Sequence, residues 1–360
     1  MTFDDVLTIK NGKNQRSVEN PDGNYPIYGS GGIMGYADDY ICNADTVIIG
    51  RKGNINKPIF VEEPFWNVDT AFGLEADISV LLPKYLYYFC KHYDFEKHNK
   101  AVTIPSLTKA DLLKIEIDLP SLSVQTDIVK RLDQVDRMIT YRSQELTVLD
   151  DLVKARFVEM FENDSDEKTY RLEEIADIVS GITKGRKTKE TEFREVPYMA
   201  VSNVKDGYID WTTVKTILAT EDEIRQYKLM PNDVLMTEGG DPDKLGRGAI
   251  ISNPPEDCIH QNHIFRVRLD EKRVLPRYFS AYLQSPKAKK YFLKAAKQTT
   301  GIASINMTQL RGLPTIIPTI DSQREYAEFC KQVDKSKAAV QKSLDETQLL
   351  FDSLMQKYFG

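Results

Sequence analysis

Apolar residues recur along one stretch of the chain with alternating steps of four and three residues. This heptad series consists of Ile128, Leu132, Val135, Ile139, Arg142, Leu146, Leu149, Val153, Arg156 and Met160. All but the two arginines are apolar, and neither Pro nor Gly interrupts the stretch. The pattern predicts one coiled-coil helix between Ser123 and Phe161. At 1.5 Å per residue this helix would be roughly 55 Å long, which is the length of a spacer.

The same series returns 198 residues later, in the same phase. Its members are Tyr326, Cys330, Val333, Lys337, Val340, Leu344, Thr347, Phe351, Leu354 and Tyr358. Matching residues also lie at the starts of the two helices. Pro120 and Pro318 end the preceding segments, and Ser123 and Asp321 are candidate N-caps. Gln125 and Gln323 follow two residues after these candidate caps. Two unrelated surface helices would not share these features, so the chain contains an internal repeat.

The repeat predicts how the 360 residues are divided. We expect a globular domain over residues 1–118, a helix over 119–162, a second globular domain over 163–318 and a second helix over 319–360. Thr108 and Asn306, again 198 residues apart, are candidate N-caps of short helices, so the repeat extends into the globular parts. Runs rich in β-branched and aromatic residues predict strands at 45–50, 59–61, 71–74, 115–119, 196–201 and 234–237. Residues 84–100 and 277–297 are predicted to be helical. The predicted fold class is α/β, of the α+β kind.

Composition indicates in which cellular compartment the protein would lie. No apolar run reaches the length of about 18 residues that a membrane span needs, and the first ten residues lack the features of a secretory signal. We therefore expect a cytoplasmic protein without a membrane partner. The four cysteines are scattered with no CxxC pair, which predicts buried, reduced thiols and argues against a zinc site or a disulfide framework.

Charge is distributed unevenly along the chain. The net charge of −6 by itself argues against nucleic-acid binding. However, residues 272–320 contain nine Lys or Arg and no Asp or Glu, whereas the two predicted coiled-coil helices carry many acids. The basic region is therefore a candidate nucleic-acid surface.

The first half contains two candidate contact loops. Four glycines and three tyrosines lie between Tyr25 and Tyr36, either as a plain turn or as a backbone that approaches a ligand closely. The strand over 45–50 leads into a basic, glycine-bearing loop that could contact phosphates or bases through Arg51, Lys52 and Asn54, although a solvated loop would look alike. A second basic segment ends in short hydroxyl side chains and adds Lys97, Lys100 and Thr103.

The second half offers matching candidates. One basic loop contains Lys184, Arg186 and Lys187, for which a solvated charge run is the alternative. Residues 238–247 correspond to the loop after Gly50 and contribute Lys244 and Arg247. The strongest signal is the acid-free run with interleaved aromatics, whose lysines would bind phosphates while hydroxyl side chains read bases. Its candidates are Lys287, Lys289, Lys290, Lys294, Lys297, Thr300 and Ser304.

Three short motifs could indicate a catalytic or metal site, and each lacks a feature that such a site needs. The segment Asn253-Pro-Pro-Glu256 is similar to the motif of adenine-N6 methyltransferases, but Glu256 replaces the stacking aromatic ring and no glycine-rich cofactor loop accompanies it. His260 and His263 would face opposite sides of a strand and so could not share a metal. The segment Asp241-Pro-Asp-Lys244 lacks the acid-x-Lys spacing of a nuclease. We expect neither a catalytic residue nor a metal site.

Five segments together carry a resemblance to a known family. They are YPIYGSGGIMGY (25–36), IIGRKGN (48–54), FWNVDTAF (65–72), IPSLTKADLLKIEIDLPSLSVQ (104–125) and KSKAAVQKSLDETQLLFDSLMQKYFG (335–360). In this combination the chain resembles the specificity (S) subunits of type I restriction-modification systems over nearly its whole length. The resemblance implies two target-recognition domains joined by two long antiparallel coiled-coil helices, related by a pseudo-two-fold repeat.

The resemblance also implies partners. The chain would read a bipartite, asymmetric site in double-stranded DNA, and two methyltransferase (M) subunits would dock on it and methylate adenine with S-adenosylmethionine. Restriction/translocase (R) subunits would add cleavage that depends on ATP and Mg²⁺. None of these cofactors would bind to this chain.

Two alternatives remain open at this stage. A methyltransferase that uses Asn253-Pro-Pro would bind S-adenosylmethionine by itself. A coiled-coil adaptor whose globular ends bind protein would show no salt-dependent affinity for DNA.

Overall fold

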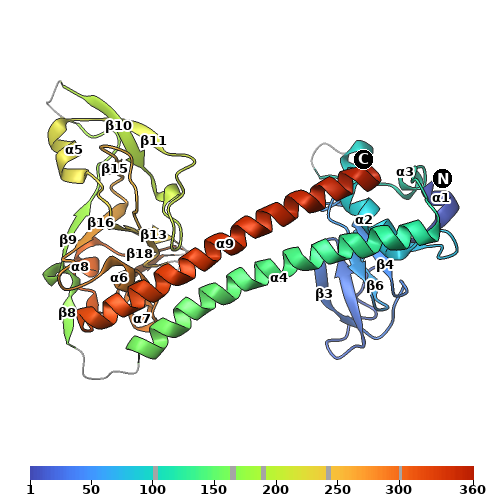
Figure 1. Ribbon diagram of the computed structural model, residues 1–360, viewed down its shortest axis with the longest axis horizontal. Coiled ribbons are helices and arrows are strands. Elements are labelled where there is room, and N and C mark those ends of the chain that lie inside the picture. Colours follow the sequence, from blue (N-terminus) through green and yellow to red (C-terminus); the bar gives the residue numbers. More distant parts are fainter. Residues whose placement is uncertain (100–103, 163–167, 188–191, 241–244, 300–301) are drawn as a thin grey trace. The chain divides into compact units, whose positions relative to one another are not determined.

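The computed structural model describes residues 1–99, 104–162, 168–187, 192–240, 245–299 and 302–360 (Figure 1). The chain forms two compact units. The first unit contains Met1–Leu146 together with Ala339–Gly360, and the second unit contains Thr147–Ala338. Each unit therefore has its own core and part of each long helix.

The two predicted long helices are present, as α4 (Leu122–Phe161) and α9 (Ile320–Phe359). Every residue of the two heptad series is buried or half-buried, including the two arginines, Lys337 and Thr347. The long stems of Arg and Lys can cover apolar surface while their charged ends reach solvent, which explains their place in the seam. The heptad spacing thus identified the inward faces correctly.

The predicted N-caps were wrong by two residues. Ser121 caps α4, because the amide of Val124 donates to its hydroxyl, and Thr319 caps α9, because the amide of Ser322 donates to its hydroxyl. Ser123 and Asp321 therefore lie inside the first turns. Each true cap directly follows the proline, and its hydroxyl accepts from the amide three residues later, as an N-cap side chain does.

Gln125 and Gln323 have the same structural role in their respective units. Both side chains are fully buried. The Gln125 oxygen accepts from the amide of Leu82 (2.9 Å), and its amide group donates to the carbonyls of Val80 (2.8 Å) and Pro120 (2.9 Å). Gln323 makes the same three contacts with Leu275, Arg273 and Pro318, at 2.8, 3.0 and 3.0 Å. Each glutamine thus fastens the start of a long helix to the loop before a shorter helix.

Replacing Gln125 with Ala should lower the free energy of unfolding by about 3 kcal/mol, because three partly buried backbone groups would lose their hydrogen-bond partner. Urea denaturation of the chain, followed by far-ultraviolet circular dichroism, measures this change. Gln134→Ala on the exposed face of α4 is the matched control and should shift stability by less than about 0.5 kcal/mol. Equal effects of the two substitutions would contradict the role of Gln125.

The first unit contains two small sheets. The larger is antiparallel, in the order β1 (Leu7–Asn11), β7 (Ala71–Ala76), β4 (Thr46–Gly50) and β5 (Ile59–Val61). The smaller has the order β3 (Gly32–Ala37), β2 (Tyr25–Gly29) and β6 (Trp66–Asn67). Its helical elements besides the long helices are α1 (Phe3–Val6), α2 (Pro83–His92), η1 (Phe95–His98) and α3 (Lys109–Leu112).

The second unit repeats this plan and adds to it. Its larger sheet has the order β14 (Gly248–Ile250), β12 (Val234–Thr237), β16 (Ile264–Leu269) and β9 (Ala176–Ser180). A three-stranded sheet follows, with the order β11 (Lys215–Ala219), β10 (Arg194–Met199) and β15 (Ile259–His260). Two further sheets are formed by β13 (Gly239–Gly240), β18 (Ile302–Ser304) and β17 (Lys297–Thr299), and by β19 (Pro314–Ile316) and β8 (Thr169–Arg171). Its helical elements are η2 (Leu172–Glu174), η3 (Val201–Asn203), α5 (Glu221–Tyr227), α6 (Pro276–Leu283), α7 (Pro286–Ala295) and α8 (Met307–Arg311).

Strand registers confirm the repeat inside the globular parts. Val47 on β4 pairs with Leu74 on β7, and Val234 on β12 pairs with Val267 on β16. In the smaller sheets, β2 and β6 are parallel, as are β10 and β15. Thr108 and Asn306 cap α3 and α8 as predicted. The expected α+β fold with an internal repeat is therefore correct.

Aromatic side chains fasten the long helices to each core. In the first unit, Tyr88 of α2 packs on Phe351 of α9, and its hydroxyl donates to Asp133 of α4 (2.6 Å). In the second unit, the ring of Phe161 lies 4.9 Å from that of Tyr278 and 5.6 Å from that of Tyr326. Burial of aromatic surface is the main stabilising contribution of such contacts. The ends of α4 and α9 are therefore part of the two cores.

Four predicted elements differ in the structure. The run over 84–100 ends as α2 at His92, and the run over 277–297 divides into α6 and α7 because Ser285-Pro286 starts a new helix. The strand expected over 115–119 is reduced to a single bridge, between Thr2 and Glu116. The single strand expected to carry His260 and His263 forms two strands, because a turn separates β15 from β16.

All four cysteines are buried and free, as expected. Burial raises the pKa of Cys42 and of Cys258 to about 12, so these thiols stay protonated at neutral pH. Within the described segments, no helix has both the length and the hydrophobicity to cross a membrane.

Candidate nucleic-acid interface

The basic loop after β4, Arg51–Asn54, is the centre of the candidate site in the first unit, and we call it the first contact loop. The amide of Arg51 donates to the carbonyl of Thr70 (2.8 Å), and its carbonyl accepts from the amide of Leu107 (2.9 Å). Three segments that are far apart in the sequence therefore meet at one residue.

Two further bonds extend this meeting point. The amide of Gly53 donates to the carbonyl of Pro105 (3.1 Å), and the hydroxyl of Ser30 donates to the carbonyl of Lys52 (3.4 Å). Ser30 lies at the turn of the β2–β3 hairpin, so the glycine-rich stretch is a hairpin that touches the first contact loop. The turn expected for that stretch is present as the turn of this hairpin, and its close approach to a ligand stays a prediction.

The first contact loop is tight and leaves its polar ends exposed. A Cβ on Gly50 would lie 2.4 Å from the carbonyl oxygen of Asn54, and Gly53 has a φ of +79°, so glycine is required at both positions. Arg51, Lys52 and Asn54 are all exposed. The guanidinium of Arg51 lies 5.8 Å from the centre of the Phe72 ring, which limits its freedom. The loop thus presents two cations and an amide to solvent.

Lys97 is a further predicted residue of the first unit that the structure describes. It is on η1, with its ammonium 5.8 Å from the centre of the Tyr93 ring. It also lines a cavity of about 470 Å³ together with Glu116 and Phe359. Lys100 and Thr103 lie outside the described residues.

The second unit has an equivalent loop, which begins at Glu238 after β12, and we call it the second contact loop. The amide of Glu238 donates to the carbonyl of His263 (3.0 Å), and its carbonyl accepts from the amide of Ile305 (2.9 Å). These bonds match those of Arg51 with Thr70 and Leu107. Ser304 pairs with Gly239 on one side and with Lys297 on the other, so the structure brings two predicted residues, Lys297 and Ser304, to this loop.

The two histidines of this region have separate environments. His260 is fully buried, and its Nδ1 lies 3.0 Å from the carbonyl oxygen of Ile264. Burial lowers the pKa of His260 to about 3, so the ring is neutral. His263 is exposed and pairs with Glu238. They do not form a metal pair, and no cluster of three or more His, Cys, Asp or Glu able to hold a metal occurs in the described chain.

The basic loop at 184–187 has mixed properties. Lys184 and Lys187 are exposed. Arg186 instead forms a bidentate ion pair with Glu223, with an Nε–Oε1 distance of 2.6 Å, and donates to the carbonyl of Leu218 (3.1 Å). The hydrogen bonds from Arg186 lower the pKa of the Glu223 carboxyl group. Arg186 is thus held by its own domain, which makes it a weaker candidate for DNA contact than its two neighbours.

Arg247 is half-buried, and its carbonyl accepts from the amide of Thr237 (3.1 Å). Its buried Nε has no hydrogen-bond partner among the described residues. A Cβ on the preceding Gly246 would lie 2.5 Å from the ring of Phe292, so this loop packs against α7. Lys244 lies outside the described residues.

Helix α7 has one inward and one basic face. Ala288 and Phe292 are buried, and the hydroxyl of Ser285 caps the helix. The lysines lie on the exposed side, and none of them forms an ion pair within the described parts of the chain. They are Lys287, Lys289, Lys290 and Lys294. Thr300, the remaining predicted residue of this run, lies outside the described residues.

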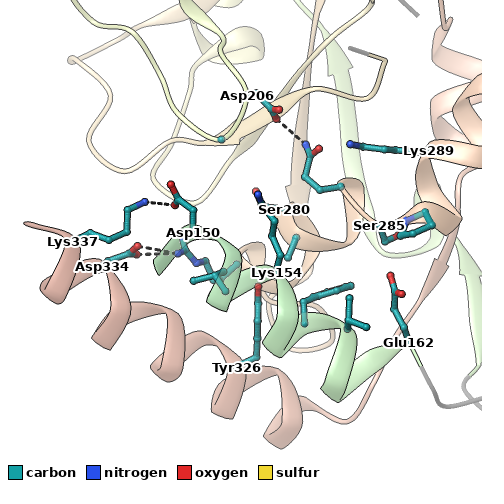
Figure 2. A pocket seen from close by; sticks show the side chains of 18 residues that line it. Asp150, Lys154, Glu162, Asp206, Ser280, Ser285, Lys289, Tyr326, Asp334 and Lys337 are labelled. Atoms are coloured by element: carbon teal, nitrogen blue, oxygen red, sulfur yellow. Dashed lines mark hydrogen bonds and ion pairs between the residues drawn. The ribbon is translucent and has the colours of Figure 1, made fainter. Parts of the chain in front are cut away.

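A cavity of about 660 Å³ lies beside α7, between α4, α6 and α9 (Figure 2). Lys337 binds Asp150 at 2.5 Å, and Figure 2 shows the two side chains pointing toward each other. Arg277 binds Asp334 at 3.0 Å. The amide of Gln284 donates to Asp206 (3.0 Å). Three of the four acids on the cavity wall therefore have partners there. Lys289 also lines this cavity, so its contacts differ from those of the other α7 lysines.

The segment Asn253-Pro-Pro-Glu256 lies between β14 and β15 and forms a turn, in which the amide of Cys258 donates to the carbonyl of Pro255 (3.1 Å). The expected turn is therefore present, but it is not a hairpin turn, because β14 and β15 belong to different sheets.

Comparison with known proteins identifies relatives of both halves. The family model described as the type I restriction modification DNA specificity domain matches residues 1–150 and 164–347. The EcoKI specificity subunit of Escherichia coli K12 is 22% identical over 267 residues, which cover 72% of this chain and 56% of that protein. The putative MjaX specificity subunit of Methanocaldococcus jannaschii is 24% identical over 192 residues, which cover 53% of this chain and 45% of that protein. The matched regions thus span about half the length of these two relatives.

A solved structure shares the fold over the whole chain. The S subunit of the type I restriction-modification system from M. genitalium aligns with a TM-score of 0.61 at 16% identity, and the alignment covers 100% of this chain and 95% of that one.

Proposed function

The chain belongs to the type I restriction-modification DNA specificity family, and from this membership we propose that it reads a bipartite, asymmetric DNA sequence on behalf of partner subunits. The observation that carries the proposal is the match of the family model to both halves of the chain. Each unit would read one half of the site. The helices α4 and α9 would fix the spacing of the two halves.

The contact loops support this assignment. They have the same backbone framework but different chemistry, with Arg51 and Lys52 in the first unit and Glu238 and Gly239 in the second. Base identity is read through side-chain donors and acceptors, so unlike side chains on a common framework would recognise unlike half-sites. The exposed lysines of α7 would add phosphate contacts that do not depend on sequence.

The proposal places catalysis in the partners. Two methyltransferase subunits would bind this chain and methylate adenine using S-adenosylmethionine, and restriction/translocase subunits would use ATP and Mg²⁺. The chain would act in the cytoplasm, on the DNA found there.

A domain exchange tests the proposal. Replacing residues 1–118 with the corresponding domain of another family member should change one half of the methylated sequence and leave the other half unchanged, because each unit has its own core and contact loop. Single-molecule sequencing of DNA from cells that express the hybrid with its methyltransferase subunits gives the methylated motif. The wild-type chain, expressed in parallel, is the control. Changes in both halves, or no defined motif with the wild-type chain, would contradict the proposal.

A further inference from the structure

Glu238 of the second contact loop pairs with His263, which directly precedes β16, and the proposed function does not yet use this pair. The Oε2 of Glu238 lies 2.5 Å from the Nδ1 of His263. Both residues are fixed through their backbones, because the Glu238 amide donates to the His263 carbonyl and the Glu238 carbonyl accepts from Ile305. The imidazole is therefore held in a defined position even though its side chain is 57% exposed.

The carboxylate determines which hydrogen-bonding groups the ring presents. An ionised carboxylate only accepts hydrogen bonds, so the Nδ1 of His263 must carry the hydrogen that it donates to Glu238. In the neutral ring, Nε2 is then an acceptor. No partner for Nε2 is found in the part of the chain that the structure describes. The Nε2 atom of the neutral His263 ring is therefore a hydrogen-bond acceptor that is exposed and fixed in position.

The surroundings suit contact with DNA. Ser304 pairs with Gly239, the residue after Glu238, and also with Lys297 on the neighbouring strand. Lys297 is exposed and can bind a phosphate from the sheet that contains Gly239. Phosphate contacts fix the register of a protein on the duplex, and side chains nearby can then read base edges.

The first unit has different residues at the same places. Arg51 and Thr70 occupy the framework positions of Glu238 and His263, since the Arg51 amide donates to the Thr70 carbonyl. Arginine is a typical reader of guanine, whereas a neutral imidazole acceptor is complementary to an amino group. The structural framework is retained although the reading group differs.

We propose that His263, oriented by Glu238, reads the exocyclic amino group of an adenine or cytosine in the major groove of the second half-site. His263 would be a specificity-determining residue and Glu238 a positioning residue that fixes the ring and its tautomer. This inference rests on the proposed DNA-reading function and identifies one base contact of the second unit.

Substitution of the pair tests the inference in the complex with the methyltransferase subunits. In His263→Ala, discrimination at one base position of the second half-site should fall by roughly 10- to 100-fold, while the first half-site stays unchanged. Glu238→Gln should relax the same position less, because the amide of Gln can either accept from Nδ1 or donate to it and so no longer imposes one tautomer. Single-molecule sequencing of methylated DNA provides the readout. Thermal unfolding of each variant verifies that the domain is intact.

The matched control is Glu221→Gln, which removes another exposed carboxylate of the second unit, one paired with Arg194 at 2.9 Å. It should leave the motif unchanged. An unaltered motif in His263→Ala would overturn the inference. An equal loss of methylation at all sequences would overturn it as well, because such a loss indicates that His263 contacts a phosphate. Either result leaves the proposed function standing provided that the wild-type complex methylates a bipartite motif. Absence of such a motif in the wild type would overturn both.

Discussion

Charge reversal of Lys287, Lys290 and Lys294 to Glu should weaken DNA binding by the assembled methyltransferase on the order of 100-fold at physiological salt. Each phosphate contact contributes about 0.9 to the slope of log K against log salt concentration, so losing three contacts should reduce the slope by about 2.7. The loss should be similar for specific and unrelated sequences, because phosphates carry no base information. Fluorescence anisotropy with labelled DNA at several salt concentrations measures both quantities.

The choice of lysines follows from the structure. Lys289 is left unchanged because it lines the cavity that also contains Asp206 and Glu162. Reversal of three other exposed cations of the second unit, Arg225, Lys272 and Lys331, is the control and should change the slope little. If the α7 variant keeps the wild-type slope, this helix does not contact DNA.

The second large effect should follow from lengthening both long helices. Four residues inserted after Leu146 and four after Ala338 add about 6 Å to each helix. Base pairs rise about 3.4 Å, so we expect the gap between the half-sites to grow by one or two base pairs. The half-site sequences themselves should stay the same, because no contact loop is altered within its own unit. The methylated motif of the insertion variant shows the gap directly.

A seven-residue insertion at the same two points is a useful comparison. It adds one heptad, so the apolar seam keeps its phase, whereas four residues shift the phase as a stutter does. We expect the gap to grow by about three base pairs. An active variant that retains the original gap would show that α4 and α9 do not determine the spacing.

The long helices were predictable from the sequence, whereas the residues at which helices begin were predicted only in part. The heptad series located both long helices because burial repeats with the period of the helix. The start of α4 was misplaced because Ser121 and Ser123 are equally plausible caps in sequence, and only the hydrogen bond from the Val124 amide to the Ser121 hydroxyl distinguishes them. The break at Ser285-Pro286 was overlooked in the same way, because the apolar pattern continues through the start of α7.

Contacts between distant segments could not be predicted. Arg51 was expected on a loop, but its bonds to Thr70 and Leu107 depend on strand pairing across the sheet. Glu238 and His263 lie 25 residues apart, and only the pairing of β12 with β16 brings them together. His263 was considered in sequence only as a partner of His260. Its real partner is not apparent from spacing alone.

The first unit is assembled from Met1–Leu146 and Ala339–Gly360, and this division of the chain determines the order in which the protein folds during synthesis. Phe351 and Met355, near the end of the chain, belong to the same core as Phe3 and Tyr85. A ribosome that has completed Leu146 must add roughly two hundred more residues before these side chains exist, which takes about 10–40 s at typical elongation rates. The second unit is continuous in sequence and can close its core earlier. The half of the protein that is made first is therefore the half that is finished last, and until then the apolar face of its nascent helix α4 is open to chaperones or to another chain.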